Sequence, residues 1–129
     1  MLLNSYFAKD LFQNKTVFIT GGSSGINLGI ARNFAAVGAN LAIVGRSQDK
    51  LDAASAELRA LGAKVSAHSA DVRDYPALEA ALASAREALG PVHTLICGAA
   101  GNFPAPAEQI SPNGFKAVVD IDLLGSFNT

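Results

Sequence analysis

A glycine-rich segment near the start of the chain could bind a phosphate group with its backbone alone. Residues 20–31 read Thr-Gly-Gly-Ser-Ser-Gly-Ile-Asn-Leu-Gly-Ile-Ala and directly follow the apolar run 17–19. We interpret them as the end of a buried strand, a tight turn and the first turns of a helix. Free N–H groups and the helix dipole favour an anion at a helix N-terminus. The pattern predicts a dinucleotide-binding β–α–β unit, and an ordinary strand–helix turn is the alternative.

The residues of this turn have complementary predicted roles. Gly21 and Gly22 permit the tight turn, and Gly25 lets a pyrophosphate approach the backbone. Ser23 and Ser24 add hydroxyl donors. We therefore expect the turn to hold the pyrophosphate of a dinucleotide.

A basic residue follows the second expected strand, at the position that distinguishes dinucleotide cofactors. Arg46 comes about twenty residues after the central glycine, where an acidic residue would bind the ribose 2′-hydroxyl and an arginine favours a 2′-phosphate. Ser47, at a predicted helix start, could add a hydroxyl and an N–H. The sequence therefore favours NADPH as the cofactor, and a solvated surface arginine is the alternative.

Two later loops supply further candidate binding residues. Asp71 can accept a hydrogen bond from an adenine amino group, with Val72 packed beside the ring; the alternative for Asp71 is a carboxylate that stabilises the next helix N-terminus. Arg73 is either a surface charge or the partner of an anionic ligand group. Gly98 and Ala99 are small enough for the cofactor's ribose and nicotinamide to lie against the backbone.

Two carboxylates lie in an apolar stretch, Asp120 and Asp122 in residues 118–124. A carboxylate there is costly to bury unless it is paired, and burial suits a group that transfers protons. Asp122 is the stronger candidate, although the residues alone slightly favour a solvated helix face. The single cysteine, Cys97, is interpreted as a small buried apolar side chain, not a nucleophile.

Hydrophobic patterns predict the elements that position these residues. Strands are expected at residues 16–20, 40–44, 64–69 and 94–97, and helices at 25–37, 47–61, 75–89 and from about Ser111. Because helices occupy every crossover, the strands must be parallel. We therefore expect an α/β, doubly wound parallel sheet that binds ligands at the carboxyl ends of its strands.

Apolar stripes predict which helix faces are buried. In the first helix the expected core residues are Ile26, Ile30, Phe34 and Val37. In the second helix they are Leu51, Ala54, Leu58 and Leu61. Both helices are expected to end at a glycine.

Composition limits the class of protein. The 129 residues are half apolar, with a net charge of −1 and one cysteine. The charge gives no reason to expect nucleic acid or an anionic membrane as a partner, and one thiol excludes an internal disulfide framework. His68 and His93 lack metal-ligand spacing, so we predict no metal site. Lys9 and Asp10 interrupt the apolar N-terminus, and no run could span a bilayer, so we predict a cytoplasmic protein.

Taken together, these motifs resemble the short-chain dehydrogenase/reductase family. The matching segments cover nearly the whole chain in order and are residues 20–26, 71–72, 99–101 and 120–125. Three segments are most similar to the 2,4-dienoyl-CoA reductases of the peroxisomal type and their bacterial relatives, namely residues 99–103, 114–116 and 120–122. Those enzymes use NADPH to reduce a conjugated dienoyl-CoA during unsaturated fatty acid breakdown. The resemblance implies a Rossmann-type sheet with strand order 3-2-1-4 and an NADP(H)-dependent oxidoreductase acting on a small molecule, an unsaturated acyl-CoA.

The resemblance also implies roles for individual residues. The pyrophosphate would be held by Gly21, Ser23, Ser24 and Ile26. The 2′-phosphate would be bound by Arg46, and the adenine by Asp71 and Val72. The acyl-CoA would face Arg73 and Phe103. Asp122 occupies the position at which most of the family has asparagine and the dienoyl-CoA reductases have an aspartate implicated in proton delivery, so the resemblance favours a catalytic Asp122.

Three features depart from the family pattern. Asn27 replaces the usual third glycine, and Cys97-Gly98 replaces the usual Asn-Asn. The family's catalytic Ser and Tyr-x-x-x-Lys do not occur in this chain. We therefore expect residues 1–129 to be the N-terminal part of one NAD(P)-binding domain, inactive alone and homotetrameric at full length, with the lysine beyond Thr129. A non-catalytic nucleotide-binding fragment, or a reductase of another carbonyl or enoyl compound, remains the alternative.

Overall fold

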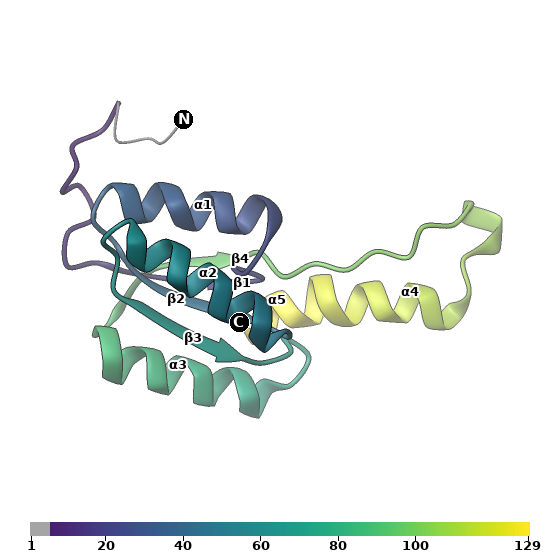
Figure 1. Ribbon diagram of the computed structural model, residues 1–129. Coiled ribbons are helices and arrows are strands. Elements are labelled where there is room, and N and C mark those ends of the chain that lie inside the picture. Colours follow the sequence, from purple (N-terminus) through teal and green to yellow (C-terminus); the bar gives the residue numbers. More distant parts are fainter. Residues whose placement is uncertain (1–5) are drawn as a thin grey trace.

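Four short apolar runs form the strands of one parallel sheet (Figure 1). The strands are β1 (Thr16–Thr20), β2 (Asn40–Gly45), β3 (Val65–Ser69) and β4 (Val92–Cys97). In the computed structural model, which describes residues 6–129, they lie in the order β3-β2-β1-β4. Thr20 at the end of β1 pairs with Val44 of β2 and with Cys97 of β4, so the carboxyl ends of these strands are level. The predicted doubly wound sheet and its strand order are confirmed; residues 1–5 of the predicted domain lie outside the described residues.

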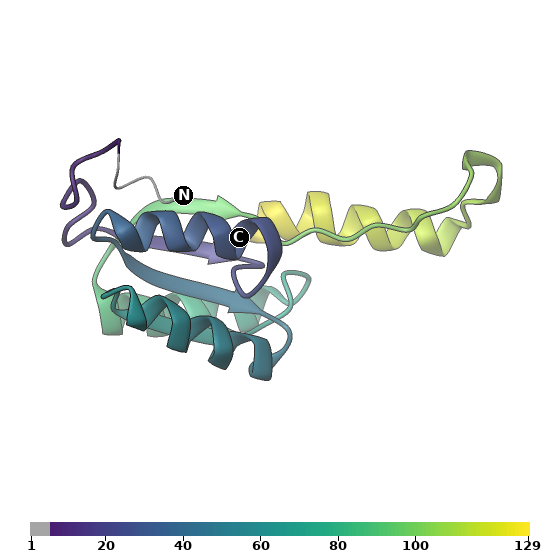
Figure 2. The same ribbon diagram turned by 45° about the horizontal axis from the view of Figure 1, so that its top comes forward.

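Helices cover both faces of the sheet (Figure 2). Helices α1 (Gly25–Ala36) and α2 (Gln48–Ala60) pack on the face that carries Val17 and Ile19. Helix α3 (Tyr75–Leu89) packs on the face that carries Phe18. Because both faces of β1 are covered, all five of its residues are buried, as parallel strands in such folds require.

Side-chain caps begin three of the helices. The carboxylate of Asp74 accepts a hydrogen bond from Ala77 N (3.1 Å) at the start of α3. Ser47 accepts from Lys50 N (3.5 Å) in α2, and Ser111 accepts from Gly114 N (3.0 Å) in α4 (Pro112–Val118). These bonds satisfy N–H groups that have no partner inside the helix. The start predicted for α2 at Ser47 follows from its capping side chain.

The stripe predicted to face the core is wrong for parts of two helices. Ile26 is 84% exposed, and Leu61 lies past the end of α2. Helix α1 instead turns its small residues Ala31 and Ala35 to the sheet, which lets the helix approach closely. Its larger apolar side chains contact the N-terminal segment, where the rings of Phe34 and Phe12 meet edge to face at 4.8 Å.

The edge strand β4 differs from the central strands. Its residues alternate between half-buried and exposed, and Leu95 is 48% exposed. Cys97 is also exposed, so its interpretation as a buried side chain is wrong. The exposed residues lie on the face of Phe18, with which Leu95 pairs, and helix α3 covers that face over β2 and β3.

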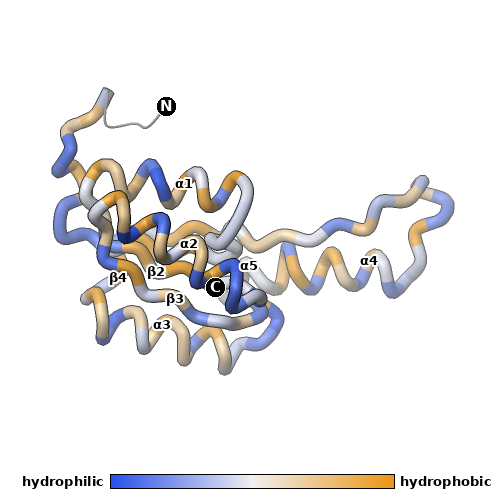
Figure 3. The backbone as a smooth tube through the Cα atoms, viewed as in Figure 1, coloured by the Kyte–Doolittle hydropathy of each residue, from blue (hydrophilic) through white to orange (hydrophobic). Residues whose placement is uncertain are grey.

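The segment after β4 forms an arm that extends from the sheet and returns (Figures 1 and 2). The chain runs outward to a short 3₁₀-helix η2 (Ala107–Gln109) and comes back through α4, the π-helical segment η3 (Val119–Leu124) and α5 (Gly125–Asn128). The single helix predicted from Ser111 is therefore interrupted by wider turns. Apolar residues recur along the returning helices (Figure 3), and Phe115 is 65% exposed. No helix formed by residues 6–129 combines the length and apolar character needed to cross a membrane.

Candidate functional site

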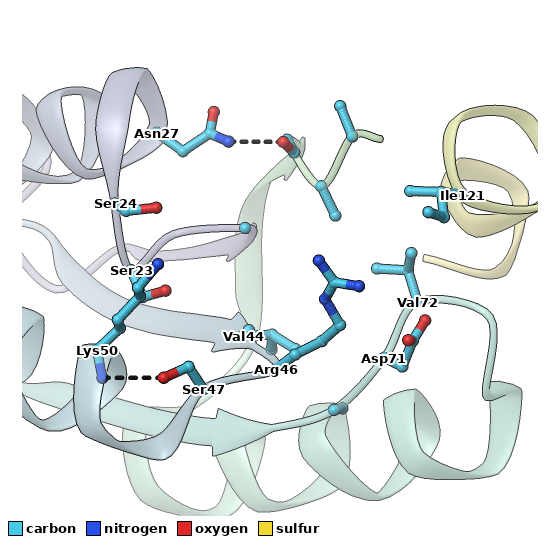
Figure 4. Close-up of a pocket in the computed structure, with 16 residues that line it drawn as sticks. Ser23, Ser24, Asn27, Val44, Arg46, Ser47, Lys50, Asp71, Val72 and Ile121 are labelled. Atoms are coloured by element: carbon cyan, nitrogen blue, oxygen red, sulfur yellow. Dashed lines mark hydrogen bonds between the residues drawn. The ribbon is translucent and has the colours of Figure 1, made fainter. Parts of the chain in front are cut away.

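A cavity of about 570 Å³ lies at the carboxyl ends of the four strands (Figure 4). It sits beside the point between β1 and β4 at which the strand order reverses, where open α/β sheets bind ligands. Its lining comprises Gly21, Ser23, Ser24, Asn27, Val44, Gly45, Arg46, Ser47, Lys50, Ala70, Asp71, Val72, Gly98, Ala99, Ala100 and Ile121. Of the residues predicted to bind the cofactor, Gly25 and Ile26 lie outside this lining in the described chain.

The glycine turn forms one wall and has the geometry of a phosphate cradle. Gly21 has a φ of 70°, and a Cβ there would lie 2.9 Å from the carbonyl oxygen of Gly98, so only glycine fits. A Cβ at Gly25 would meet open space. The first hydrogen bond of α1 runs from Leu28 N to Ser24 O (3.1 Å), so the N–H groups of residues 25–27 precede the helical bonding pattern. These free donors at the positive end of a helix dipole fit a pyrophosphate.

Basic side chains gather where β2 leads into α2. Arg46 follows β2 directly, and its guanidinium lies inside the cavity in Figure 4. Ser47 caps α2, and Lys50 lies one helical turn further on, also in the lining. Sequence reasoning missed Lys50, although its spacing of three residues from the helix cap Ser47 places both on the same side of the first turn. The three residues together could hold a phosphate dianion.

The loop after β3 carries an ion pair that changes what Asp71 can do. Arg73 donates from Nε to Asp71 Oδ1 (2.9 Å) and from Nη2 to Oδ2 (2.6 Å), and its backbone N adds a bond of 3.0 Å. The hydrogen bonds from Arg73 lower the pKa of Asp71 to about 2 against the opposing effect of partial burial, and the charge of Arg46 adds to the lowering. Asp71 is therefore an ionised acceptor whose two oxygens already have donors, while Val72 presents an apolar side chain to the cavity.

The two residues predicted to face an acyl-CoA lie in different surroundings. Arg73 is bound to Asp71 at the start of α3. The ring of Phe103 instead covers Gly114 of α4, where a Cβ would come within 2.7 Å of it. The described structure therefore places Arg73 beside the end of the cavity formed by β3, and Phe103 in the arm.

Small residues after β4 form the opposite wall, and side chains from other elements hold their backbone. Thr20 Oγ1 accepts hydrogen bonds from Gly98 N (3.2 Å) and Ala99 N (3.3 Å). Asn27 donates from Nδ2 to Gly98 O (2.6 Å), which links the first turn of α1 to the end of β4 (Figure 4). This wall presents backbone and methyl groups, with little side-chain bulk.

Asp122 contacts the loop that continues this wall after Ala100. Its Oδ1 accepts a hydrogen bond from Gly101 N (2.8 Å), and its backbone carbonyl accepts one from Ser126 Oγ (2.6 Å). Asp122 lies in the π-helical segment, a feature that is frequent at functional sites. Its neighbour Ile121 reaches the cavity lining. The half-buried Asp122 therefore orients the loop that bounds the cavity.

Comparison with known proteins agrees with this geometry. The family model described as short chain dehydrogenase matches residues 15–129. The chain belongs to the short chain dehydrogenase family. The predicted family is thus confirmed.

Three similar proteins illustrate the relationship. The chain is 40% identical over 126 residues to a peroxisomal 2,4-dienoyl-CoA reductase of Arabidopsis thaliana, and 46% identical over 123 residues to the enzyme of that name from Mus musculus. These matches cover 98% and 95% of this chain but 42% of each relative, so the chain spans less than half of their length. A solved actinorhodin polyketide ketoreductase with NADPH superposes with a TM-score of 0.85 at 28% identity, covering 92% of this chain and 46% of that one.

The names of these relatives correct one prediction. The enzymes from Arabidopsis thaliana and Mus musculus are named peroxisomal, which contradicts the cytoplasmic location predicted for this protein. The prediction rested on the lack of an apolar leader, and that feature distinguishes secreted proteins only.

Proposed function

We propose that the protein containing this chain is an NADPH-dependent oxidoreductase that reduces an unsaturated acyl-CoA of the 2,4-dienoyl type, as in unsaturated fatty acid breakdown. The observation that carries the cofactor choice is the guanidinium of Arg46 inside the cavity, with Ser47 and Lys50 beside it. The names of the similar reductases support the substrate class. Under this proposal the chain is the N-terminal part of one NAD(P)-binding domain.

The cavity residues suggest how the cofactor would lie. The N-terminus of α1, with Ser23 and Ser24, would hold the pyrophosphate. Arg46 and its neighbours would bind the 2′-phosphate, because a guanidinium and an ammonium favour a dianion. Val72 would pack beside the adenine. The nicotinamide and its ribose would then lie against the wall that begins at Gly98.

The reaction would consume one hydride and one proton. A bound reduced nicotinamide supplies the hydride, so that dienoyl-CoA, NADPH and a proton become enoyl-CoA and NADP⁺. Asp122 would keep the loop at Gly101 in place. We propose that its carboxyl also supports proton delivery, since it is half-buried directly behind the cavity wall.

The exposed apolar side chains of the arm support a proposal on assembly. Phe115, Leu123 and Phe127 are each more than half exposed, and large apolar patches mark surfaces that contact other protein. We propose that these residues are covered in a homo-oligomer, a tetramer. Light scattering on the full-length protein would detect it, and a monomer would contradict it.

The test of the proposed activity uses the full-length protein. Oxidation of NADPH should occur with a 2,4-dienoyl-CoA and be much slower with a saturated-chain ketone, and NADPH should bind more tightly than NADH in a fluorescence titration. Equal affinities would contradict the role of Arg46. Turnover of the ketone alone would indicate a carbonyl reductase. NADPH binding without turnover of either compound would indicate a non-catalytic nucleotide-binding protein.

A further inference from the structure

Two residues of the cavity lining at which the resemblance expects a departure from the family pattern, Asn27 in α1 and Gly98 after β4, are in contact. Asn27 stands in place of a glycine, and Gly98 stands in place of an asparagine. They are 71 residues apart in sequence, yet Asn27 Nδ2 donates a hydrogen bond of 2.6 Å to Gly98 O. The side chain is therefore absent on one side of the contact and present on the other, the reverse of the family arrangement.

The amide of Asn27 occupies the space that a side chain at position 98 would need. A Cβ on Gly98 would lie 2.5 Å from Asn27 Oδ1 and 2.6 Å from both Cγ and Nδ2 of the same residue. The three atoms nearest to that Cβ all belong to Asn27. Real Cβ atoms do not approach other heavy atoms so closely, so a side chain at position 98 requires that the amide of Asn27 move aside, which breaks its hydrogen bond to Gly98 O. The two residues form one unit whose parts depend on each other.

The hydrogen bond holds a carbonyl that several other groups also constrain. Gly21 passes so close that a Cβ there would meet Gly98 O at 2.9 Å. Thr20 Oγ1 holds the N–H groups of Gly98 and Ala99. Asn27 therefore completes a set of contacts that leaves the backbone after β4 little freedom. Asn27, Gly98 and Ala99 all line the cavity.

We propose that Asn27 is a positioning residue that acts through Gly98 to orient the cavity wall facing the nicotinamide half of the cofactor. This inference rests on the function proposed above. The bond links the backbone after β4 to the first turn of α1. Removing it leaves the Gly98 carbonyl without its side-chain donor and lets the wall shift by a few tenths of an ångström, enough to misalign hydride transfer.

The experiment is a double-mutant cycle in the full-length protein. Hydride transfer is followed in a single turnover with NADPH and dienoyl-CoA, and the fluorescence of bound NADPH reports the nicotinamide environment. Asn27→Gly should slow hydride transfer about tenfold while the NADPH dissociation constant changes about threefold or less. Gly98→Asn should be at least as slow, because its side chain collides with Asn27. The double variant should recover to within about threefold of the parent, since the glycine and the asparagine then exchange places.

A matched control separates this role from helix stability. Asn33 is also in α1, and its Nδ2 donates to Gly29 O (2.8 Å) one turn earlier. It lines a second, apolar cavity against the N-terminal segment. Asn33→Gly introduces the same flexible residue into the same helix, so it should lower the unfolding temperature to a similar extent without changing hydride transfer or NADPH fluorescence.

Three outcomes would overturn the proposal. Additive effects in the cycle would show that the two residues do not act as a unit. An Asn27→Gly variant with lowered unfolding temperature but unchanged hydride transfer would show a purely structural role. If that variant does not fold, Asn27→Ser serves in its place with the same criteria. A parent protein that does not bind NADPH would overturn the proposed function and this inference together, whereas the first two outcomes leave the proposed function standing.

Discussion

The two ends of the cavity are lined by different kinds of chemical group. At the end formed by β2 and β3, charged side chains line the cavity, with Arg46 and Lys50 on one side and Asp71 on the other. At the end formed by β1 and β4, the lining is backbone, methyl groups and small polar side chains, and the backbone after β4 donates hydrogen bonds to Thr20 and accepts one from Asn27. The first end is charged, and the second presents a backbone surface anchored at several points.

This difference follows from what each end must recognise. A phosphate carries a concentrated charge, so a mobile basic side chain can bind it without an exact position. A reacting carbon atom must be placed within a few tenths of an ångström, which a backbone anchored at several points achieves better. We therefore expect substitutions at the charged end to change affinity and those at the backbone end to change rate.

The largest expected effect tests the backbone end. In the full-length protein, Asp122→Ala should lower turnover of dienoyl-CoA about 100-fold or more, since both the support of Gly101 and any proton delivery are lost. The NADPH dissociation constant should stay within about threefold, because the charged end is untouched. Steady-state kinetics and titration measure the two quantities.

Asp122→Asn distinguishes the two parts of that effect. An amide oxygen can still accept the hydrogen bond from Gly101 N but cannot take part in proton transfer. Activity close to that of the parent would assign Asp122 to positioning alone. A loss of turnover as large as that of Asp122→Ala would assign Asp122 to proton transfer. Unchanged turnover in both variants would refute both the positioning role and the proton-transfer role.

The next largest effect tests the charged end. Arg46→Ala should weaken NADPH binding about tenfold to 100-fold and leave NADH binding unchanged, because a charge-assisted bond to the 2′-phosphate is removed. Lys50→Ala should have a smaller effect of the same kind that fades with added salt. Isothermal titration with both cofactors measures these changes.

Arg59→Ala is the matched control for that comparison. Arg59 lies in the last turn of α2, the helix that contains Lys50, and donates a hydrogen bond to Val65 O (3.1 Å). Its replacement by alanine removes the same charge as Arg46→Ala but leaves the cavity lining unchanged. Equal losses for Arg46→Ala and Arg59→Ala would show that overall charge, not a local contact, governs the NADPH preference.

The smallest effect concerns stability against pH at the charged end. The pKa of Asp71 lies near 2, below its ordinary value of 3.8, because Arg73 donates to its carboxylate. The ionised pair should therefore stabilise the fold above about pH 4 and lose this contribution as the pH falls toward 2. Because both side chains are partly exposed, the free energy of unfolding should drop by about 1 kcal/mol or less in Asp71→Asn at neutral pH.

Chemical denaturation at several pH values checks this expectation. The difference between the parent and Asp71→Asn should shrink as the pH is lowered from 5 to 2, where the parent carboxylate becomes protonated. A difference that is constant across this range would mean that the ion pair does not contribute. Glu57→Gln, which removes the exposed ion pair of Glu57 with Arg32, should show the same trend without any effect on NADPH binding.

Local patterns were sufficient to predict the turn and the elements around it. The apolar run of β1, the glycines and the start of α1 are contiguous, so their bonding is decided within about ten residues. Arg46 could be placed because it directly follows a strand that the pattern identifies. Lys50 needed one further step, since its spacing from Ser47 matters only once the helix start is known.

Predictions of burial failed where distant segments compete for the same face. Ile26, in the first turn of α1, is exposed, whereas Ala31 and Ala35 face the sheet and Phe34 packs against both this core and Phe12 of the N-terminal segment. Cys97 looks apolar in sequence but lies on an edge strand. In each case the decision depends on which element lies alongside, and hydrophobic periodicity does not contain that information.

The sequence by itself therefore determined the class of fold, the phosphate-binding turn and the basic group beside it, because each depends on residues that are close along the chain. The tertiary structure alone decided the contacts between Asn27 and Gly98 and between Asp122 and Gly101. Those pairs are 71 and 21 residues apart. The pairing of β1 with β4 brings Asn27 to Gly98, and the return of the arm through η3 brings Asp122 to Gly101. Asn27 carries no sign of its partner along the chain, and only the fold shows that its amide fills the space beside Gly98 and bonds to the Gly98 carbonyl.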